Sequence, residues 1–261
     1  MATGEMVEAP AARPPGPTDI ARPERRTRRW RRRSLPMAGL VLGPVLLAVA
    51  VYVFLFVGKS PARLTLSTAA PGATPPANAS EVTGTWIVGA ESVAGYRVQE
   101  KLASLPAPSE AVGRTHDVVG TLTVRLEGDT LVAEGVTVQV NVTTLVSDQK
   151  PRDNRIRTSG LQSNTYPTAS FVVPDPVRLP PGVARGEATT VEVKGLLTIH
   201  GATREVTLPL QIRLSGQKGE VVGSLEFSFT DFGMDPPNIG DFVTVDPDAT
   251  LEFQLFLERS A

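Results

Sequence analysis

The chain has 261 residues, no cysteine and a formal net charge of −1, and 41% of its residues are hydrophobic. This length and apolar content suffice for one large folded domain or two small ones. The lack of cysteine excludes disulfides, zinc–thiolate centres and thiol nucleophiles. The near-neutral total hides an asymmetry, because the segment before Lys59 carries nine arginines against four acidic residues, whereas the remainder is acidic.

Residues 1–34 are rich in proline, alanine and arginine and contain few large apolar side chains. A segment of this composition cannot bury a hydrophobic core, so we expect a disordered, basic tail. We interpret its arginines as topology determinants and contacts to lipid phosphates, in preference to a nucleic-acid site. We therefore expect no nucleic-acid partner.

Residues 35–58 contain no charged side chain, and about 20 apolar residues are enough for a helix to cross a bilayer. The arginine cluster before this segment predicts a cytoplasmic N-terminus and an extracytoplasmic C-terminal part. A cleaved signal peptide is the alternative, although its apolar core is usually only ~7–15 residues long. We expect a single transmembrane helix that anchors the chain in the cell membrane.

Residues 59–81 are a Pro/Ala/Ser/Thr stretch without a core-forming pattern, which is typical of a linker. The folded domain is predicted to span residues 82–261. There, apolar and polar residues alternate, as in "GVTVQVNVT", where Val136, Val138, Val140 and Val142 share one face. Repetition of this pattern predicts roughly eight strands.

One strand of this domain carries a proline in its interior. Pro209 lies within "REVTLPLQIRLSG", where it removes one donor from the backbone hydrogen-bond ladder. The strand is therefore predicted to be an edge strand, bulged, or irregular at that position.

The alternation predicts an all-β domain built from antiparallel strands, because each strand has one apolar and one polar face. With no long amphipathic helix to cover it, the sheet must form a sandwich or a barrel. A barrel of ~8 strands is either filled by side chains or holds one small ligand, and periodicity does not decide between the two. The residues expected on the inward face are Tyr96, Val98, Leu122, Val124, Val138, Val140, Phe171, Leu197, Ile199, Phe227, Phe229, Phe253 and Leu255.

The sequence offers little for catalysis. Its two histidines, His116 and His200, lie in no recognisable catalytic motif, and we interpret His200 as a turn residue that contacts the backbone. The acidic stretch "DFVTVDPD" lacks the ligand spacing of a calcium loop. We expect no catalytic residue, no metal, no cofactor and no enzymatic activity.

Four stretches, "TGTWIVGAESVAGYRV", "PRDNRIRTSGLQSNTYPTASF", "VKGLLTIHGATREVTLPL" and "FSFTDFGM", follow one another in the order typical of the YceI-like family of bacterial envelope proteins. The chain resembles this family from about residue 83 to residue 259. The resemblance implies an extended, lipocalin-like, eight-stranded antiparallel barrel whose hydrophobic pore holds a polyisoprenoid or another long-chain amphiphile. The chain departs from the family in its long apolar segment and in its first loop, "QEKLASLPAPSEAVGRTHDVVG", which lacks a common histidine-containing pattern.

The stretch "PRDNRIRTSGLQ" resembles the short helical connection of the family. Asp153 suits the first turn of such a helix, because a negative charge there is favoured by the helix dipole. Ile156 and Leu161 are expected to pack on the barrel, with the arginines facing solvent. An open alternative is that Arg152 or Arg155 contacts an acidic head group.

These observations predict a membrane-anchored, extracytoplasmic lipid-binding protein with an apolar barrel interior. The thirteen inward residues are its candidate lining. The alternative is an interaction module with a filled core that acts through its surface.

Overall fold

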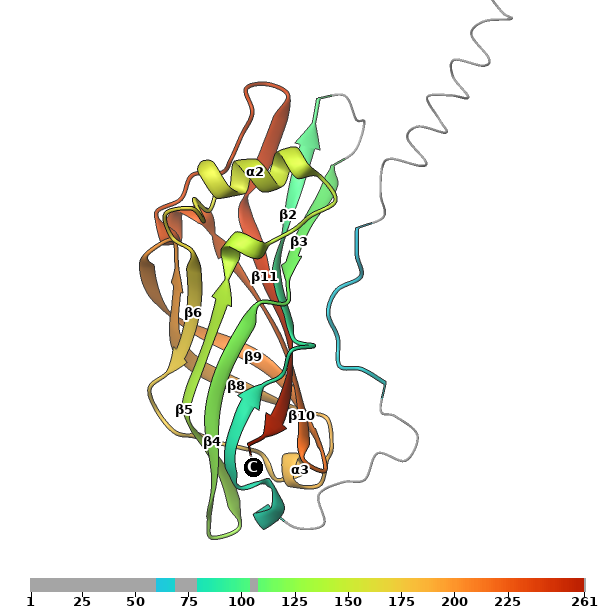
Figure 1. Ribbon diagram of the computed structural model, residues 1–261, viewed down its shortest axis with the longest axis vertical. Helices are drawn as coiled ribbons and strands as arrows, with labels where there is room; N and C mark the ends of the chain where they lie inside the picture. The colour runs from blue at the N-terminus through green and yellow to red at the C-terminus, as the bar shows by residue number, and fades with distance from the viewer. Residues whose placement is uncertain (1–59, 69–78, 104–107, 261) are drawn as a thin grey trace, which may run out of the picture. The chain divides into compact units, whose positions relative to one another are not determined.

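The computed structural model describes residues 60–68, 79–103 and 108–260, all within the compact unit Val57–Ala261. Figure 1 shows its elements. In chain order they are η1 (Ala79–Val82), β1 (Gly84–Val88), β2 (Val93–Leu102), β3 (Ser109–Thr115), β4 (Val118–Glu127), β5 (Thr130–Asn141), η2 (Val142–Thr144), α2 (Lys150–Thr158), β6 (Thr168–Val173), β7 (Val177–Arg178), α3 (Pro181–Ala184), β8 (Thr189–Ile199), β9 (Ala202–Ser215), β10 (Lys218–Ser228), η3 (Phe229–Phe232) and β11 (Val243–Arg259).

The strands close into an antiparallel barrel. The ring runs β1-β4-β5-β6-β8-β9-β10-β11, and β1 also pairs with β11, so the ring has eight members. β11 is long enough to pair with β1 near its C-terminal end and with β2 over the rest of its length. β2 in turn pairs with β3. The prediction of an all-β, eight-stranded antiparallel barrel is confirmed.

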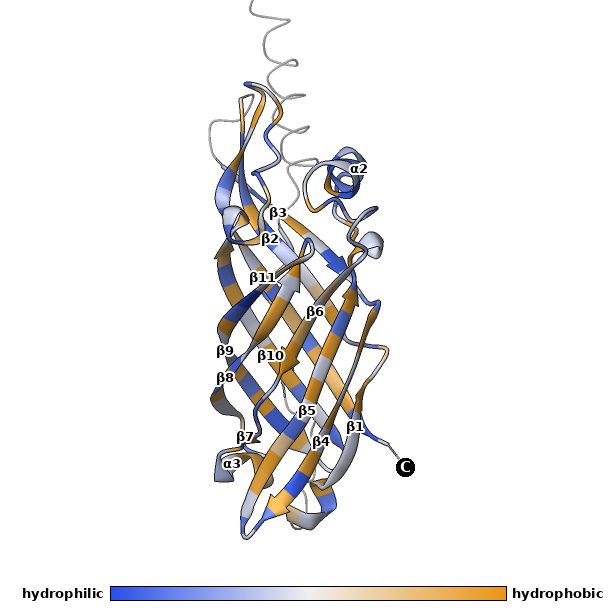
Figure 2. Cartoon of the chain, turned by 90° about the vertical axis from the view of Figure 1, so that its left-hand side faces the viewer, coloured by the Kyte–Doolittle hydropathy of each residue, from blue (hydrophilic) through white to orange (hydrophobic). Residues whose placement is uncertain are grey.

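Bands of hydrophobic and hydrophilic residues alternate along the strands in Figure 2, as the period of two requires. The expectation that "QEKLASLPAPSEAVGRTHDVVG" forms the first loop is wrong, because most of this stretch is strand. β2 continues to Leu102 and β3 begins at Ser109. Alternation fails to reveal the end of β2 because Gln99, Glu100 and Lys101 are all polar. Of these, Glu100 is buried, so a polar residue occupies an inward position.

Pro209 lies where β9 loses one of its two neighbours. β9 pairs with β8 from Ala202 to Ile212, but its register with β10 begins only at Leu210. A residue without a backbone donor is tolerated at such a one-sided position. Of the three predicted alternatives, the structure shows the edge position, because the pairing with β8 continues through Pro209 without a register shift.

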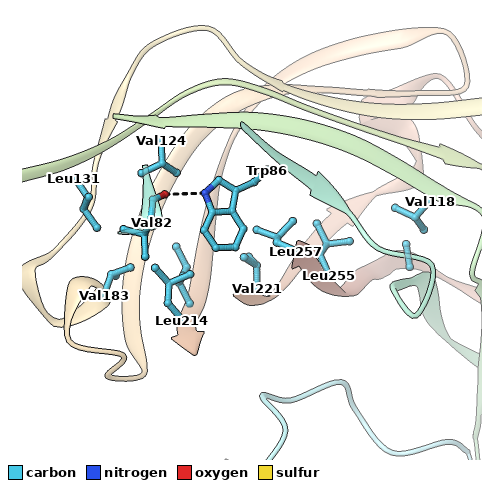
Figure 3. Packing of buried hydrophobic residues seen from close by; sticks show 12 residues of the cluster. Val82, Trp86, Val118, Val124, Leu131, Val183, Leu214, Val221, Leu255 and Leu257 are labelled. Carbon is cyan, nitrogen blue, oxygen red and sulfur yellow. Dashed lines mark hydrogen bonds between the residues drawn. The ribbon is translucent and has the colours of Figure 1, made fainter. Parts of the chain in front are cut away.

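The two ends of the barrel differ. At one end, Val82 of η1 and Val183 of α3 pack with Trp86, whose indole nitrogen donates a 2.9 Å hydrogen bond to the Val82 carbonyl (Figure 3). At the other end lies α2 (Figure 1), the helix predicted from "PRDNRIRTSGLQ". Its Asp153 is buried in the first turn and accepts hydrogen bonds from the amide and hydroxyl of Ser147, at 2.9 and 2.6 Å.

Residues 60–68, which we call the strap, lie against the outer wall of the barrel. Arg97 donates to the carbonyls of Pro61 and Ala62, at 2.6 and 2.7 Å, and Ser60 donates to the carbonyl of Glu110 at 2.7 Å. Further along, the Ser67 amide donates to Glu220 at 2.7 Å. The strap therefore follows the outer surface across several strands.

Beneath the strap is a group of paired charges. Glu252 is 2% exposed and contacts Arg97 at 2.6 Å and Arg114 at 2.8 Å, and Arg97 also contacts Glu110 at 2.8 Å. Burial opposes the charge on Arg97, but its hydrogen bonds to the two carboxylates outweigh this and raise the pKa of the guanidinium. We call Arg97, Glu110, Arg114 and Glu252 the outer ion cluster.

No helix in the described ranges is long and apolar enough to span a membrane. The transmembrane segment predicted for residues 35–58 lies outside the described residues, as does the basic tail of residues 1–34.

Candidate functional site

The interior of the barrel holds two adjoining cavities. The first, which we call the lower chamber, has a volume of about 150 Å³ and lies at the η1/α3 end beside Trp86 and Val183. The second, the upper chamber, has a volume of about 120 Å³ and lies beneath α2 beside Tyr96 and Arg152. The chambers share four lining residues, Ala94, Val140, Ala169 and Leu251. They therefore form two parts of one elongated interior.

The thirteen candidate residues all lie on the walls of these chambers. Those on the lower chamber are Leu122, Val124, Val138, Phe171, Leu197, Phe253 and Leu255. Val140 lines both, and those on the upper chamber are Tyr96, Val98, Ile199, Phe227 and Phe229. The period-two pattern thus identified which side of each strand faces inward.

Other lining residues escaped the sequence analysis. Trp86 lies on a strand of five residues, too short to establish a period, and Val183 and Met234 lie on short helical or turn segments. A lone large apolar residue beside a glycine or proline turn is the signal that could have identified them. Such residues seal the ends of the barrel, where the strands stop.

Three aromatic rings lie against the wall over glycines of neighbouring strands. A β-carbon at Gly223 would lie 2.5 Å from Phe253 Cζ, and one at Gly195 would lie 2.4 Å from Phe171 Cζ. At Gly113 the same atom would lie 2.3 Å from Tyr96 Cε1. Real β-carbons do not approach other atoms this closely, so only glycine admits the rings at these positions. The rings occupy space that side chains would otherwise fill along the wall.

The lower chamber has an apolar surface. Its lining side chains are aliphatic or aromatic apart from the hydroxyl residues Thr121, Thr137 and Ser170. Apolar cavities of about 150 Å³ stay free of water and take up apolar molecules. The chamber is therefore suited to a hydrocarbon.

The upper chamber has a charged end. Arg152 of α2 donates to Glu100 through Nε at 2.9 Å and through Nη2 at 2.8 Å, and its Nη1 contacts Asp148. Burial lowers the pKa of Arg152, but the hydrogen bonds and negative charges of Glu100 and Asp148 together outweigh burial and raise the pKa overall. The expectation that Arg152 faces solvent is wrong, since its side chain is 18% exposed and lines the chamber.

The sequence also predicts contacts for Ile156, Leu161 and Arg155 in and after this helix. Ile156 and Leu161 line the upper chamber, so the prediction that they pack on the barrel is confirmed. Arg155 is not part of the lining and donates to the carbonyl of Asn238. The second candidate for a head-group contact therefore binds a loop of the protein itself.

The histidines contact backbone carbonyls. His116 Nδ1 lies 2.9 Å from the Ser92 carbonyl oxygen, and His200 Nδ1 lies 3.3 Å from that of Phe232. His200 occupies the β8–β9 turn with φ +53°, and its ring packs 4.3 Å from the ring of Tyr166. It is thus a turn residue, as the sequence indicates.

These features define a class: a closed, eight-stranded antiparallel barrel with an apolar interior and one polar end. The chain belongs to the YceI-like domain family, whose sequence pattern matches residues 87–256. The resemblance noted in the sequence is confirmed. No curated protein matches the chain.

The same fold occurs in a solved structure. The chain is similar to a polyisoprenoid binding domain from Saccharophagus degradans, at 18% identity and a TM-score of 0.54, with 68% of this chain and 99% of that chain covered. It also matches BcnA from Burkholderia cenocepacia, at 18% identity and a TM-score of 0.45, over 62% of this chain and 95% of that one. The YCEI protein of Campylobacter jejuni matches at 12% identity and a TM-score of 0.44, over 78% and 93%.

Proposed function

We propose that this protein binds a polyisoprenoid or another long-chain amphiphile inside the barrel. The observation that carries the proposal is the pair of adjoining chambers, whose shared residues join two apolar spaces into one elongated interior. An extended hydrocarbon tail fits such a space better than a compact ligand does.

The energetics favour retention of a tail without a covalent link. Burial of each methylene contributes ~0.8 kcal/mol, so a tail of many carbons needs few polar contacts. The name of the similar domain from Saccharophagus degradans, a polyisoprenoid binding domain, supports the same class of ligand. The protein acts by binding, and the backbone contacts of His116 and His200 agree with a role without catalysis.

The same proposal places the barrel outside the cytoplasmic membrane and tethers it there through residues 35–58. The support is the uncharged segment and the arginine cluster before it. N-terminal sequencing of the protein recovered from membranes is expected to read from the start of the chain. A mature N-terminus within residues 59–80 would overturn the anchor.

The lipid proposal is tested by mass spectrometry of an organic extract of the purified protein, which is expected to contain a long-chain compound. Leu197→Trp places a larger ring in the lower chamber, which Leu197 lines, and is expected to remove that compound at modest cost in stability. The matched control is Leu196→Trp, because Leu196 is the neighbouring residue on the outer face and is 38% exposed.

The two variants separate a binding cavity from a packed core. In a filled interior, the Leu197→Trp change would overpack the barrel and cost about 1–3 kcal/mol with no ligand to lose. An extract without any long-chain compound, together with a steep fall in melting temperature for Leu197→Trp alone, would reject the proposal.

A further inference from the structure

The upper chamber contains one polar group that the protein leaves without a partner. The hydroxyl of Tyr96 is buried, and among the described residues nothing hydrogen-bonds to it. The ring is held in place over Gly113, where a β-carbon would lie 2.8 Å from the hydroxyl oxygen. A buried hydroxyl without a partner costs stability, so a single unsatisfied group in an apolar wall suggests a contact to a ligand.

The charged groups around this hydroxyl are mostly negative. Arg152 uses all three of its nitrogens, two on Glu100 and one on Asp148 and Ser147. Asp153 adds a third carboxylate near Tyr96, and it is bound to Ser147. One guanidinium therefore faces three carboxylates, and the end of the chamber is neutral to negative.

A phosphate or carboxylate brought to this end would meet an arginine already bound in a fork by Glu100. It would add a further negative charge beside Glu100, Asp148 and Asp153, and taking over the fork would leave Glu100 buried without its partner, which is strongly unfavourable. Arg155 does not line the chamber: its Nη2 donates to the Asn238 carbonyl, and its buried Nε has no hydrogen-bond partner among the described residues. Burial also raises the pKa of Tyr96, so the phenol stays protonated and remains a hydrogen-bond donor.

We propose that the upper chamber selects an uncharged head group, in which an oxygen such as that of an alcohol or an amide accepts a hydrogen bond from the Tyr96 hydroxyl. The ligand is then a neutral amphiphile, with its tail in the lower chamber and its head beneath α2. This inference rests on the proposed lipid-binding function and specifies the class of lipid.

The test uses the full-length protein in phosphatidylcholine nanodiscs and four probes with one C18 tail: oleyl alcohol, oleamide, oleic acid and oleyl phosphate. Octadecene serves as a probe with no polar head. The alcohol and the amide are expected to bind at least about tenfold more tightly than the acid and the phosphate, because a charged head would lie beside three carboxylates and one guanidinium.

Tyr96→Phe removes the donor and keeps the ring over Gly113. It is expected to weaken binding of the alcohol and the amide about fivefold, because one hydrogen bond is lost. Binding of octadecene is expected to stay unchanged. Without ligand, its melting temperature is expected to equal or exceed that of the wild type, because an unsatisfied hydroxyl has been removed. Tyr166→Phe is the matched control, since the ring of Tyr166 packs at a tilt against His200 and lines neither chamber.

The outcomes distinguish this inference from the function on which it rests. If the acid or the phosphate binds as tightly as the alcohol, or if Tyr96→Phe affects octadecene equally, the neutral-head inference is overturned while lipid binding stands. If none of the probes binds, octadecene included, both proposals fail.

Discussion

The two faces of the same strands solve opposite problems. On β2, Tyr96 lines the upper chamber while the next residue, Arg97, joins the outer ion cluster. On β11, Phe253 lines the lower chamber while Glu252, its neighbour, pairs with Arg97 and Arg114. Outside, buried charges are matched by one another and by the strap; inside, apolar walls enclose open space. The outer face of these strands therefore contributes to stability, and the inner face encloses the proposed binding space.

The comparison is tested most severely on the outer face. Glu252→Ala removes a carboxylate from the buried Arg97 and the half-buried Arg114, so the free energy of unfolding is expected to fall by about 3–5 kcal/mol. Urea denaturation of the full-length protein measures this loss. Bound lipid per folded molecule is expected to be unchanged, because the side chain faces away from the chambers.

The matched control is Glu187→Ala, which breaks an exposed pair with Arg185 whose side chains are 60% and 55% exposed. Its expected cost is too small for urea denaturation to resolve, because water and salt screen an exposed pair. Equal costs for the two variants would show that the strap and the ion cluster add nothing beyond an ordinary surface pair.

The inner face is tested at Gly223. An alanine there conflicts with Phe253 Cζ at 2.5 Å and Leu210 Cδ2 at 2.8 Å, so the ring must move into the lower chamber. We expect at least a tenfold loss of bound lipid with a stability cost of about 1–3 kcal/mol. Mass spectrometry of extracts and urea denaturation measure the two effects.

Ser224→Ala is the control for Gly223→Ala, because Ser224 is the next residue of β10 and is exposed on the outer face. It is expected to change neither quantity. Unchanged lipid content in Gly223→Ala would mean that Phe253 does not border the bound tail, and the division between the two faces would no longer hold.

The smallest expected effect is local and depends on pH. Burial raises the pKa of Glu220, but hydrogen bonds from Ser67 and Gln254 outweigh this and lower it below its ordinary value of 4.5. A lowered carboxyl pKa stabilises the docked strap above pH 4.5, and this contribution is lost as the pH falls through the lower folded-state value. Below that pH, the hydrogen-exchange protection factor of the Ser67 amide is expected to fall about fivefold.

Protection of the Val221 amide in β10 serves as an internal reference and is expected to stay constant over the same range. Glu220→Gln is expected to remove the pH dependence at Ser67. Parallel loss of protection at both amides would mean that the strap opens only when the barrel unfolds.

The sequence predicts the inner face far better than the outer one. A period of two identifies inward residues such as Leu122 and Val138, because apolar side chains must alternate on a half-buried strand. It misses the strap because the contacts of Pro61 and Ala62 are made by backbone carbonyls, which every residue has. It misjudges Arg152 because its partner Glu100 comes from a strand 52 residues earlier in the chain.

The one-sided ladder at Pro209 has a mechanical consequence. From Pro209 towards the β8–β9 turn, β9 is held by β8 alone, while β10 from Ser224 onwards is held by β11 alone. A tube slit along part of its length is least stiff across the slit. We therefore expect the barrel to change its diameter most readily between these parts of β9 and β10, because no backbone hydrogen bond between the two strands has to break there.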